Sequence, residues 1–317
     1  MEPLSAPRGL IVELITPLTE KGLIHRSSLE RCLSRVVKFA QGIFLASPIG
    51  GEGLQLDLKA RQEILAQALE VTRGKLPLMI WITGKDEEET RRILFGLHSS
   101  VENKEEKDSI FWVDAPLMYH SNRGLPSLYK EYGSITDLPF ILLNDPGLIE
   151  HSKRPFKRKN IRTAVLKELT YLPSVVGLIF VGELDRAHNY QKAARGRSRF
   201  RIYDGDEARF LDYPSLSGVV SVGANLLPQQ WHQVTSSSLH LSGRGQDYPD
   251  SLRQIWFMGQ QLHRLREIYL QAPPFFIKAA LKKLDVIESA FSLEQPHHPK
   301  GLDQLMELLR EYHDGGA

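Results

Sequence analysis

Short apolar runs recur along this chain, and each is separated from the next by a stretch with helical periodicity. Most of the runs are continuously apolar rather than alternating, which is typical of strands buried on both faces of a parallel sheet. Eight such strand–helix units predict an α/β fold, a (β/α)8 TIM barrel, which usually takes about 250 residues. The expected strands span residues 10–15, 42–47, 78–83, 110–114, 140–143, 175–180, 200–203 and 219–222.

Helix signals lie between these runs. Ser27 followed by Glu30 has the spacing of a capping box, and Gly42 stops the first helix. A second helix is expected over residues 57–73. A doubly wound open sheet is the alternative fold, but no Gly-rich phosphate loop follows the first strand.

The last part of the chain predicts a C-terminal helical extension, with helices over residues 251–269, 275–287 and 302–312. The serine- and threonine-rich segment from Thr235 to Ser238 is expected to be a loop that leads into it. We therefore predict a barrel over residues 8–235 and a helical region over residues 236–317.

Composition excludes several classes of protein. The net charge of +2 gives no reason to expect nucleic acid as a partner. The single cysteine, Cys32, allows no internal disulfide, and its neighbours place it on the buried face of a helix. No signal peptide and no apolar run of roughly 20 residues are present, so we expect a cytoplasmic protein without a membrane partner.

Several short motifs then follow one another in a fixed order. Together they resemble the dihydrodipicolinate synthase and N-acetylneuraminate lyase family of class I pyruvate aldolases, from about Gly9 to Leu281. Seven matches in order are strong grounds for the fold and weaker grounds for function. The motifs are Thr16-Pro17-Leu18, Gly50-Gly51-Glu52, Pro116 with Tyr119, Asn144-Asp145-Pro146 after residues 139–143, residues 175–179, residues 218–225 and residues 277–281.

The resemblance implies a specific chemistry, and this chain departs from it at each step. In the family, a lysine on strand six forms a Schiff base with a 2-oxo acid, and a tyrosine on strand five moves protons. The corresponding positions here are Ile179 and Leu143. Two threonines and the backbone amides of the loop after strand two hold the substrate carboxylate, and the threonine positions are Ile49 and Gly50.

These changes predict a divergent member of the family without Schiff-base lyase activity, a ligand-binding or regulatory pseudoenzyme. One alternative is a carbon–carbon lyase on a 2-oxo acid with altered catalytic residues. Another is a structural partner of an active paralogue, since the resemblance implies a homo-oligomer, a dimer or a tetramer. We expect no cofactor and no metal, and the ligand is unknown. The pocket is expected to contain Ile49, Gly50, Gly51, Glu52, Tyr119, Asn144 and Val220.

Other residues carry weaker hypotheses. Lys85 follows strand three and is a candidate for a relocated Schiff-base lysine, but it is better explained as an exposed charge at a helix start. The run from Lys153 to Arg162 is rich in Lys and Arg and is either a surface insertion or an anion-attracting lid. Residues near the strand ends and one histidine pair are candidate metal ligands, but they lack a short metal-ligand spacing: Glu52, Asp114, Asp145, Glu183, His120 and His297-His298.

Overall fold

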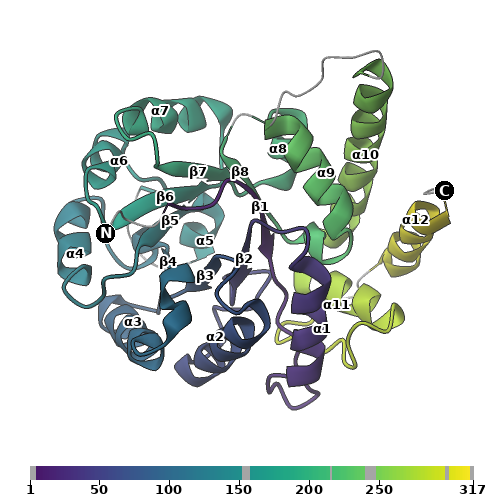
Figure 1. Ribbon diagram of the computed structural model, residues 1–317, viewed down its shortest axis with the longest axis horizontal. Coiled ribbons are helices and arrows are strands. Elements are labelled where there is room, and N and C mark those ends of the chain that lie inside the picture. Colours follow the sequence, from purple (N-terminus) through teal and green to yellow (C-terminus); the bar gives the residue numbers. More distant parts are fainter. Residues whose placement is uncertain (1–4, 152–157, 215, 240–247, 297–299, 315–317) are drawn as a thin grey trace.

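A computed structural model describes residues 5–151, 158–214, 216–239, 248–296 and 300–314. Eight parallel strands close into a barrel in sequence order, with β1 paired to β8, so the predicted fold is confirmed (Figure 1). The strands are β1 Gly9–Glu13, β2 Gly42–Leu45, β3 Leu78–Trp81, β4 Ile110–Asp114, β5 Phe140–Asn144, β6 Val175–Phe180, β7 Arg201–Asp204 and β8 Gly218–Ser221.

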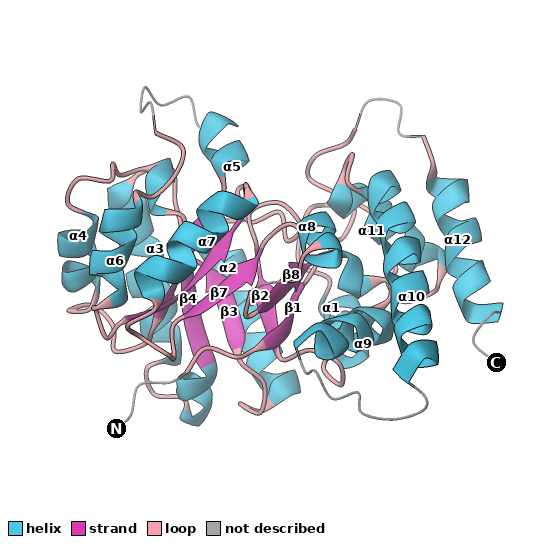
Figure 2. Cartoon of the chain, turned by 90° about the horizontal axis from the view of Figure 1, so that it is seen from above, coloured by secondary structure: helices cyan, strands magenta, loops and turns pink. Residues whose placement is uncertain are grey.

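Helices surround the barrel, and the helices that end the chain gather on one side of it (Figures 1 and 2). The barrel helices are α1 Arg26–Val36, α2 Leu58–Thr72, α3 Glu87–Val101, α4 Leu125–Tyr132, α5 Pro146–His151, α6 Thr163–Thr170, α7 Leu184–Ala194 and α8 Glu207–Asp212. The helices that follow them are α9 Pro228–Leu239, α10 Tyr248–Tyr269, α11 Pro273–Lys283 and α12 Leu302–Asp314.

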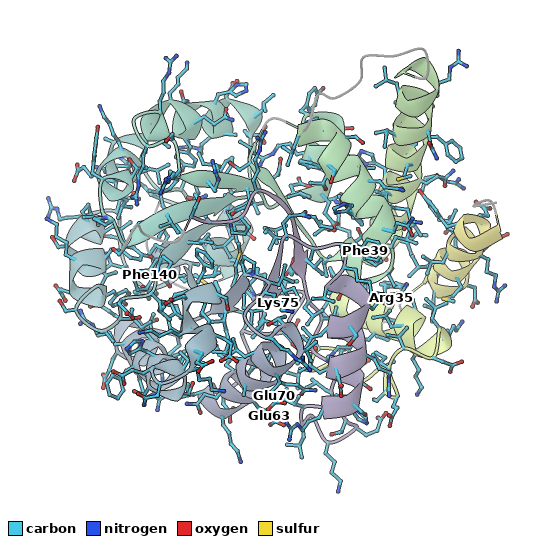
Figure 3. All side chains as sticks on the ribbon, viewed as in Figure 1. Arg35, Phe39, Glu63, Glu70, Lys75 and Phe140 are labelled. Carbon is cyan, nitrogen blue, oxygen red and sulfur yellow. The ribbon has the colours of Figure 1, made fainter. Side chains whose placement is uncertain are left out.

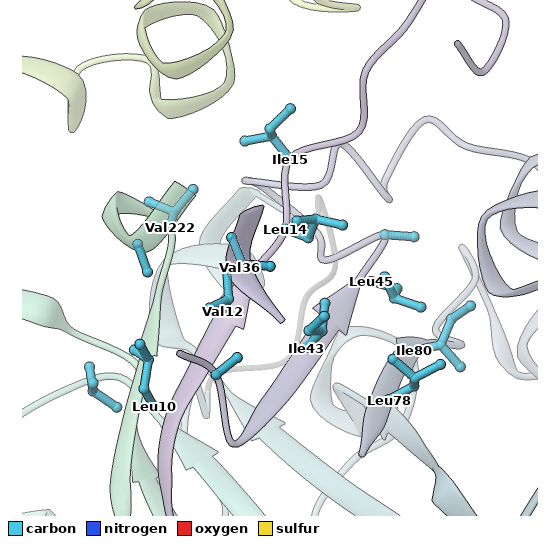
Figure 4. Packing of buried hydrophobic residues seen from close by; sticks show 14 of the residues in the cluster. Leu10, Val12, Leu14, Ile15, Val36, Ile43, Leu45, Leu78, Ile80 and Val222 are labelled. Atoms are coloured by element: carbon cyan, nitrogen blue, oxygen red, sulfur yellow. The ribbon is translucent and has the colours of Figure 1, made fainter. Parts of the chain in front are cut away.

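Alternate strand residues pack into two separate cores, because successive side chains of a strand point to opposite faces. Val12, Ile43 and Ile80 belong to the outer core between the sheet and the helices (Figure 4). Ile11 and Phe44 belong to a smaller core inside the barrel. The interior of the barrel is therefore filled with side chains.

Local signals set the helix boundaries, with one correction. Asp57 caps α2, because its Oδ1 accepts a hydrogen bond from the backbone nitrogen of Ala60 at 2.8 Å. The capping box predicted at Ser27 is wrong. The helix α1 begins at Arg26, and its cap is His25, whose ring accepts a hydrogen bond from the backbone nitrogen of Ser28. Ser27 lies inside the first turn, and its hydroxyl instead donates to Glu288.

The segment from Thr235 to Ser238 is helical, so its prediction as a loop is wrong. It lies in α9, where the Ser238 hydroxyl donates to the carbonyl of Val234 at 2.8 Å. Hydroxyls satisfied by the helix backbone in this way do not break a helix. The predicted boundary between the barrel and the helical region, at residues 235/236, therefore falls inside α9. This helix packs on β1 and against α10.

Two further sequence inferences concern burial. Cys32 is buried in the outer core, and burial raises the pKa of its thiol to about 12, so the thiol is structural as predicted. None of the helices in the described part of the chain combines the length and apolar character that a membrane crossing requires.

Candidate functional site

A cavity of about 230 Å³ opens at the carboxyl ends of the strands, the end where barrel enzymes place their working groups. Its floor consists of Phe44, Leu143, Ile179 and Val220, which all belong to the inner core. Leu143 and Ile179 are direct partners in the β5–β6 register and are 5% and 2% exposed. The two family positions thus lie side by side at the mouth, and both carry hydrocarbon.

Glu13 occupies one wall of this cavity, at the end of β1. Its Oε1 accepts hydrogen bonds from the Ser47 hydroxyl at 2.7 Å and from the backbone nitrogen of Gly50 at 3.0 Å. A side chain at position 50 would meet Glu13 Oε1 at 2.8 Å, which explains why glycine is present there. The resemblance implies that the backbone amides of this loop bind the substrate carboxylate. In this structure the Gly50 amide is already hydrogen-bonded to the carboxylate of Glu13.

The second oxygen of Glu13, Oε2, receives no hydrogen bond from any described residue. Burial raises the pKa of this carboxyl, and the bonds from Ser47 and Gly50 oppose the shift. The nearby charge of Glu207 also raises it. A carboxyl with a raised pKa and one free oxygen is suited to hydrogen bonding with a ligand in the cavity.

Glu207 also lines the cavity, near Glu13, and both of its carboxylate oxygens accept hydrogen bonds. Its Oε1 accepts from the Ser221 hydroxyl at 2.6 Å and from the backbone nitrogen of Gly223 at 2.8 Å. Its Oε2 accepts from the Tyr269 hydroxyl at 2.7 Å, so α10 is tied to the barrel mouth. Burial raises the pKa of Glu207 as well, and these hydrogen bonds oppose the rise.

The charges around the mouth are mostly negative. Among the described residues the lining holds four carboxylates and a single cation, Arg266, and it holds no lysine. Arg266 is itself paired, because its Nη2 lies 2.7 Å from Asp206 Oδ1 and its Nε lies 3.8 Å from Glu207 Oε2. An anionic ligand would therefore meet no unopposed positive charge in this part of the chain.

Some residues predicted for the pocket line it, and others support its walls. Ile49, Gly50 and Val220 line the cavity together with the two family positions. Glu52 is buried away from it, where it pairs with the Lys278 ammonium and accepts from the backbone nitrogen of Leu293 at 2.6 Å. Gly51 packs so closely on Ser47 that a side chain there would meet the Ser47 backbone nitrogen at 2.4 Å.

Tyr119 and Asn144 are also outside the cavity lining. The Tyr119 hydroxyl donates to Asp114 at 2.7 Å, inside the packing between β4 and α4. Asn144 donates to the Asn160 side chain at 2.9 Å and accepts from the backbone nitrogen of Ile161 at 2.7 Å. Both residues therefore fix the loops after their strands.

The relocated-lysine and metal hypotheses find no support in the described residues. Lys85 is exposed ahead of Asp86, the cap of α3, and does not line the cavity. The carboxylate of Asp114 accepts hydrogen bonds from the hydroxyls of Thr83 and Tyr129 as well as from that of Tyr119. No group of three His, Cys, Asp or Glu side chains suited to a metal ion occurs in the described part of the chain.

Two of the sequence candidates lie wholly or partly outside the described residues. His297-His298 is one of them, and residues 152–157 of the basic segment are the other. In the described remainder of that segment, Lys159 pairs with Glu150, and neither Lys159 nor Arg162 lines the cavity. The described end of the segment therefore contributes no charge to the cavity wall.

Sequence reasoning named Asp145 near the mouth but missed Glu13, Arg266 and Tyr269. Glu13 had a signal, since it is the single charged residue in the apolar run 10–15. Arg266 and Tyr269 had none, because they come from a helix that follows the barrel. Their place at the mouth follows from the packing of α10 against α8 and α9.

A larger groove of about 820 Å³ lies away from the mouth, between α1, α9, α10 and α12. Arg35 of α1 and Phe39 of the turn that follows α1 line it (Figure 3). Among its described lining residues only Arg35 and Glu311 carry a charge, and the others are mainly glutamine or apolar. The mouth is the better candidate site, because it combines an apolar floor with several convergent polar groups.

Comparisons with known proteins agree with this geometry. The 4-hydroxy-tetrahydrodipicolinate synthase of Buchnera aphidicola (strain Tuc7) is 26% identical over 289 residues, 89% of each chain. A dihydrodipicolinate synthase from Thermotoga maritima has a TM-score of 0.77 at 21% identity, covering 96% of this chain and 98% of that one. One from Acinetobacter baumannii, solved with pyruvate, has a TM-score of 0.75 at 19% identity, covering 98% and 99%. At these identities the two structures show the fold alone. The family itself is shown by a match over residues 6–311, and the chain belongs to the dihydrodipicolinate synthetase family.

Proposed function

We propose that this family member binds a ligand at the barrel mouth without forming a Schiff base, as a ligand-binding or regulatory protein. One observation carries the proposal. The floor at the lysine and tyrosine positions is Ile179 beside Leu143, and the carboxylate-binding loop above it is already occupied by Glu13. Each half of this arrangement opposes a different step of the aldolase reaction.

The first step that it opposes is imine formation. A Schiff base requires a primary amine within reach of the substrate carbonyl. Ile179 offers none, and the described lining of the cavity contains no lysine. Leu143 likewise offers no hydroxyl for proton transfer during carbon–carbon bond cleavage.

The second step is recognition of the 2-oxo acid. Its carboxylate would have to displace Glu13 from the backbone nitrogen of Gly50 and then lie near Glu207 and Asp145. Like charges at such a site repel each other, and a carboxylate buried without donors is costly. We therefore expect a ligand that is less acidic than pyruvate, held by the apolar floor and by Glu13.

Trapping with pyruvate and borohydride tests the proposal. The expected result is an unchanged intact mass, with an active dihydrodipicolinate synthase reduced to a stable adduct in parallel. A stable adduct that peptide mapping places on one particular lysine of this chain would contradict the proposal. An adduct mapped to Lys85 would revive the relocated lysine, and peptide mapping separates it from nonspecific modification.

One observation favours a second candidate, a lyase with altered catalytic residues. Glu13 presents a free oxygen to the cavity, and its raised pKa suits acid–base chemistry. Proton abstraction from pyruvate by Glu13 would exchange the methyl protons with solvent deuterium without any imine. Proton NMR in deuterium oxide measures this, and we expect no exchange above the rate in buffer. Assembly with an active paralogue stays a prediction.

A further inference from the structure

A second cavity lies at the opposite end of the barrel, where the strands begin. It measures about 340 Å³ and is bounded by the segment before β1, the end of α7 with the loop to β7, and the residues before β8. Four arginines line it, Arg8, Arg195, Arg197 and Arg201. No aspartate or glutamate occurs among its described lining residues, so their charges are not balanced locally.

Arg197 fixes the position of this loop. Its guanidinium donates to the carbonyls of Thr170, Leu172 and Val175 at 2.9, 2.5 and 2.8 Å, and to the carbonyl of Pro173 at 3.1 Å. These carbonyls belong to the end of α6 and the entry into β6, where a cation is favoured by the helix dipole. The segment that carries Arg195 and Arg201 is therefore held in place beside this second cavity.

The other three arginines retain unused donors. Arg195 is exposed, and its guanidinium makes no hydrogen bond or ion pair with the described residues. Arg8 donates from Nη2 alone, to the carbonyl of Leu239 at 3.2 Å. Arg201 donates from Nη1 to the carbonyl of Ser198 at 3.1 Å, and its buried Nε has no acceptor among the described residues. Buried donors without acceptors are rare in native proteins and call for an explanation.

We propose that this cavity binds a small organic phosphate. Guanidinium groups match phosphate oxygens with two parallel hydrogen bonds, and three arginines with free donors converge here. Bound phosphate would supply the negative charge that the described lining lacks. This inference is independent of the function proposed for the barrel mouth.

The shape of the cavity selects the kind of phosphate. Its volume lies at the lower end of the roughly 300–1,000 Å³ typical of small-molecule sites. Ala194, Phe200, Ile202 and Leu216 give it an apolar wall beside the arginines. An apolar surface of this kind beside the arginines fits the carbon skeleton of a phosphate monoester better than an extended polymer backbone. The net charge of +2 also gives no support for nucleic acid.

Isothermal titration calorimetry of the full chain with glycerol 3-phosphate and inorganic phosphate, at low ionic strength, tests the proposal. We expect saturable binding of both, with the monoester tighter. The double variant Arg8→Met/Arg195→Met should bind at least about tenfold more weakly, because it removes two guanidinium forks. Arg195→Lys, which keeps the charge and loses the fork, should weaken binding less.

Two controls show whether a loss of phosphate binding comes from the cavity arginines themselves. Arg8 and Arg195 are both exposed, so the double variant should keep the melting temperature of the wild type. Arg310→Met removes an exposed arginine from α12 and should leave phosphate binding unchanged. Absence of saturable binding to the wild type, or equal binding by the double variant, would overturn the proposal. Binding only to phosphatidic acid vesicles or to single-stranded DNA would overturn it as well.

Discussion

The cavity at the carboxyl ends of the strands and the cavity at their amino ends differ in the sign of the charges that line them. The mouth carries four carboxylates against one paired arginine, and the opposite end carries four arginines with no described carboxylate. The polar groups of the mouth are mostly bound to one another, whereas Arg195 at the other end is free within the described chain. The difference indicates that the end of the barrel where barrel enzymes place their working groups is, in this chain, ill suited to anions.

The largest expected contrast between the two ends is in stability. Glu207→Ala removes acceptors for Ser221, Gly223 and Tyr269, so it should lower the free energy of unfolding by about 3–5 kcal/mol, as loss of one member of a buried charged network does. Arg195→Ala should change it by less than about 0.5 kcal/mol. Urea unfolding followed by circular dichroism measures both. Equal losses of unfolding free energy in the two variants would contradict the expected difference between the two ends of the barrel.

Removing Glu13 should partly return the mouth to carboxylate binding. Glu13→Ala frees the backbone nitrogen of Gly50 and the Ser47 hydroxyl, and hydrogen bonds to charged groups contribute about 1.5–3 kcal/mol. Pyruvate should therefore bind about ten- to a hundredfold more tightly than to the wild type, by ligand-observed NMR titration. Glu13→Gln is the matched control, because its carbonyl still accepts from both donors and should give no gain. A gain in the control alone would show that charge matters and occupancy does not.

The pH dependence of stability should also separate the mouth from ordinary surface carboxylates. The pKa of Glu13 is raised in the folded protein, so the folded state holds this proton after the unfolded chain has lost it. The stability that Glu13 contributes is present below the unfolded pKa of 4.5 and is lost as pH rises through the folded value. Each pKa unit of separation corresponds to about 1.4 kcal/mol.

Glu13→Gln removes this titration, so the variant should become more stable relative to the wild type as pH rises from 4.5. Melting temperatures of the two proteins across the pH range measure the trend. Glu183→Gln, at an exposed position ahead of α7, is the matched control for the chemical change from glutamate to glutamine. A relative stability that falls with rising pH would mean that the Glu13 pKa is lowered instead.

The smallest expected effect belongs to Ile179→Lys. It should leave pyruvate condensation and 2-oxo acid cleavage undetectable, because Leu143 still lacks a hydroxyl and Glu13 still fills the loop. Catalytic groups that act as a unit are strongly non-additive. Turnover by this single variant within about a hundredfold of the typical 10 per second would show that the mouth has kept its chemistry.

The barrel could be predicted from the sequence because its signal is local and repeated. Continuous apolar runs placed all eight strands, and Asp57 placed the start of α2. The hydroxyl-rich segment around Thr235 misled, because a hydroxyl such as that of Ser238 can bond to the backbone of its own helix. Local composition cannot distinguish that arrangement from a loop.

The mouth could be predicted only in part. Ile179 and Leu143, which the resemblance names, both line the cavity, because the strand register pairs them at the carboxyl ends of β5 and β6. The resemblance could not place Arg266 and Tyr269, whose contacts depend on how α10 packs after the barrel closes. Its motif assigned Glu52 to the pocket. Its ion-pair partner Lys278 lies more than two hundred residues further along the sequence and holds Glu52 away from the cavity.

The central claim is that Glu13 occupies the place of a substrate carboxylate above an apolar floor. Crystals of the wild-type protein grown with pyruvate test it most directly. We expect Glu13 Oε1 still to accept from the backbone nitrogen of Gly50, and no pyruvate to lie beside Ile179. Pyruvate bound to that nitrogen, with Glu13 turned away, would contradict it.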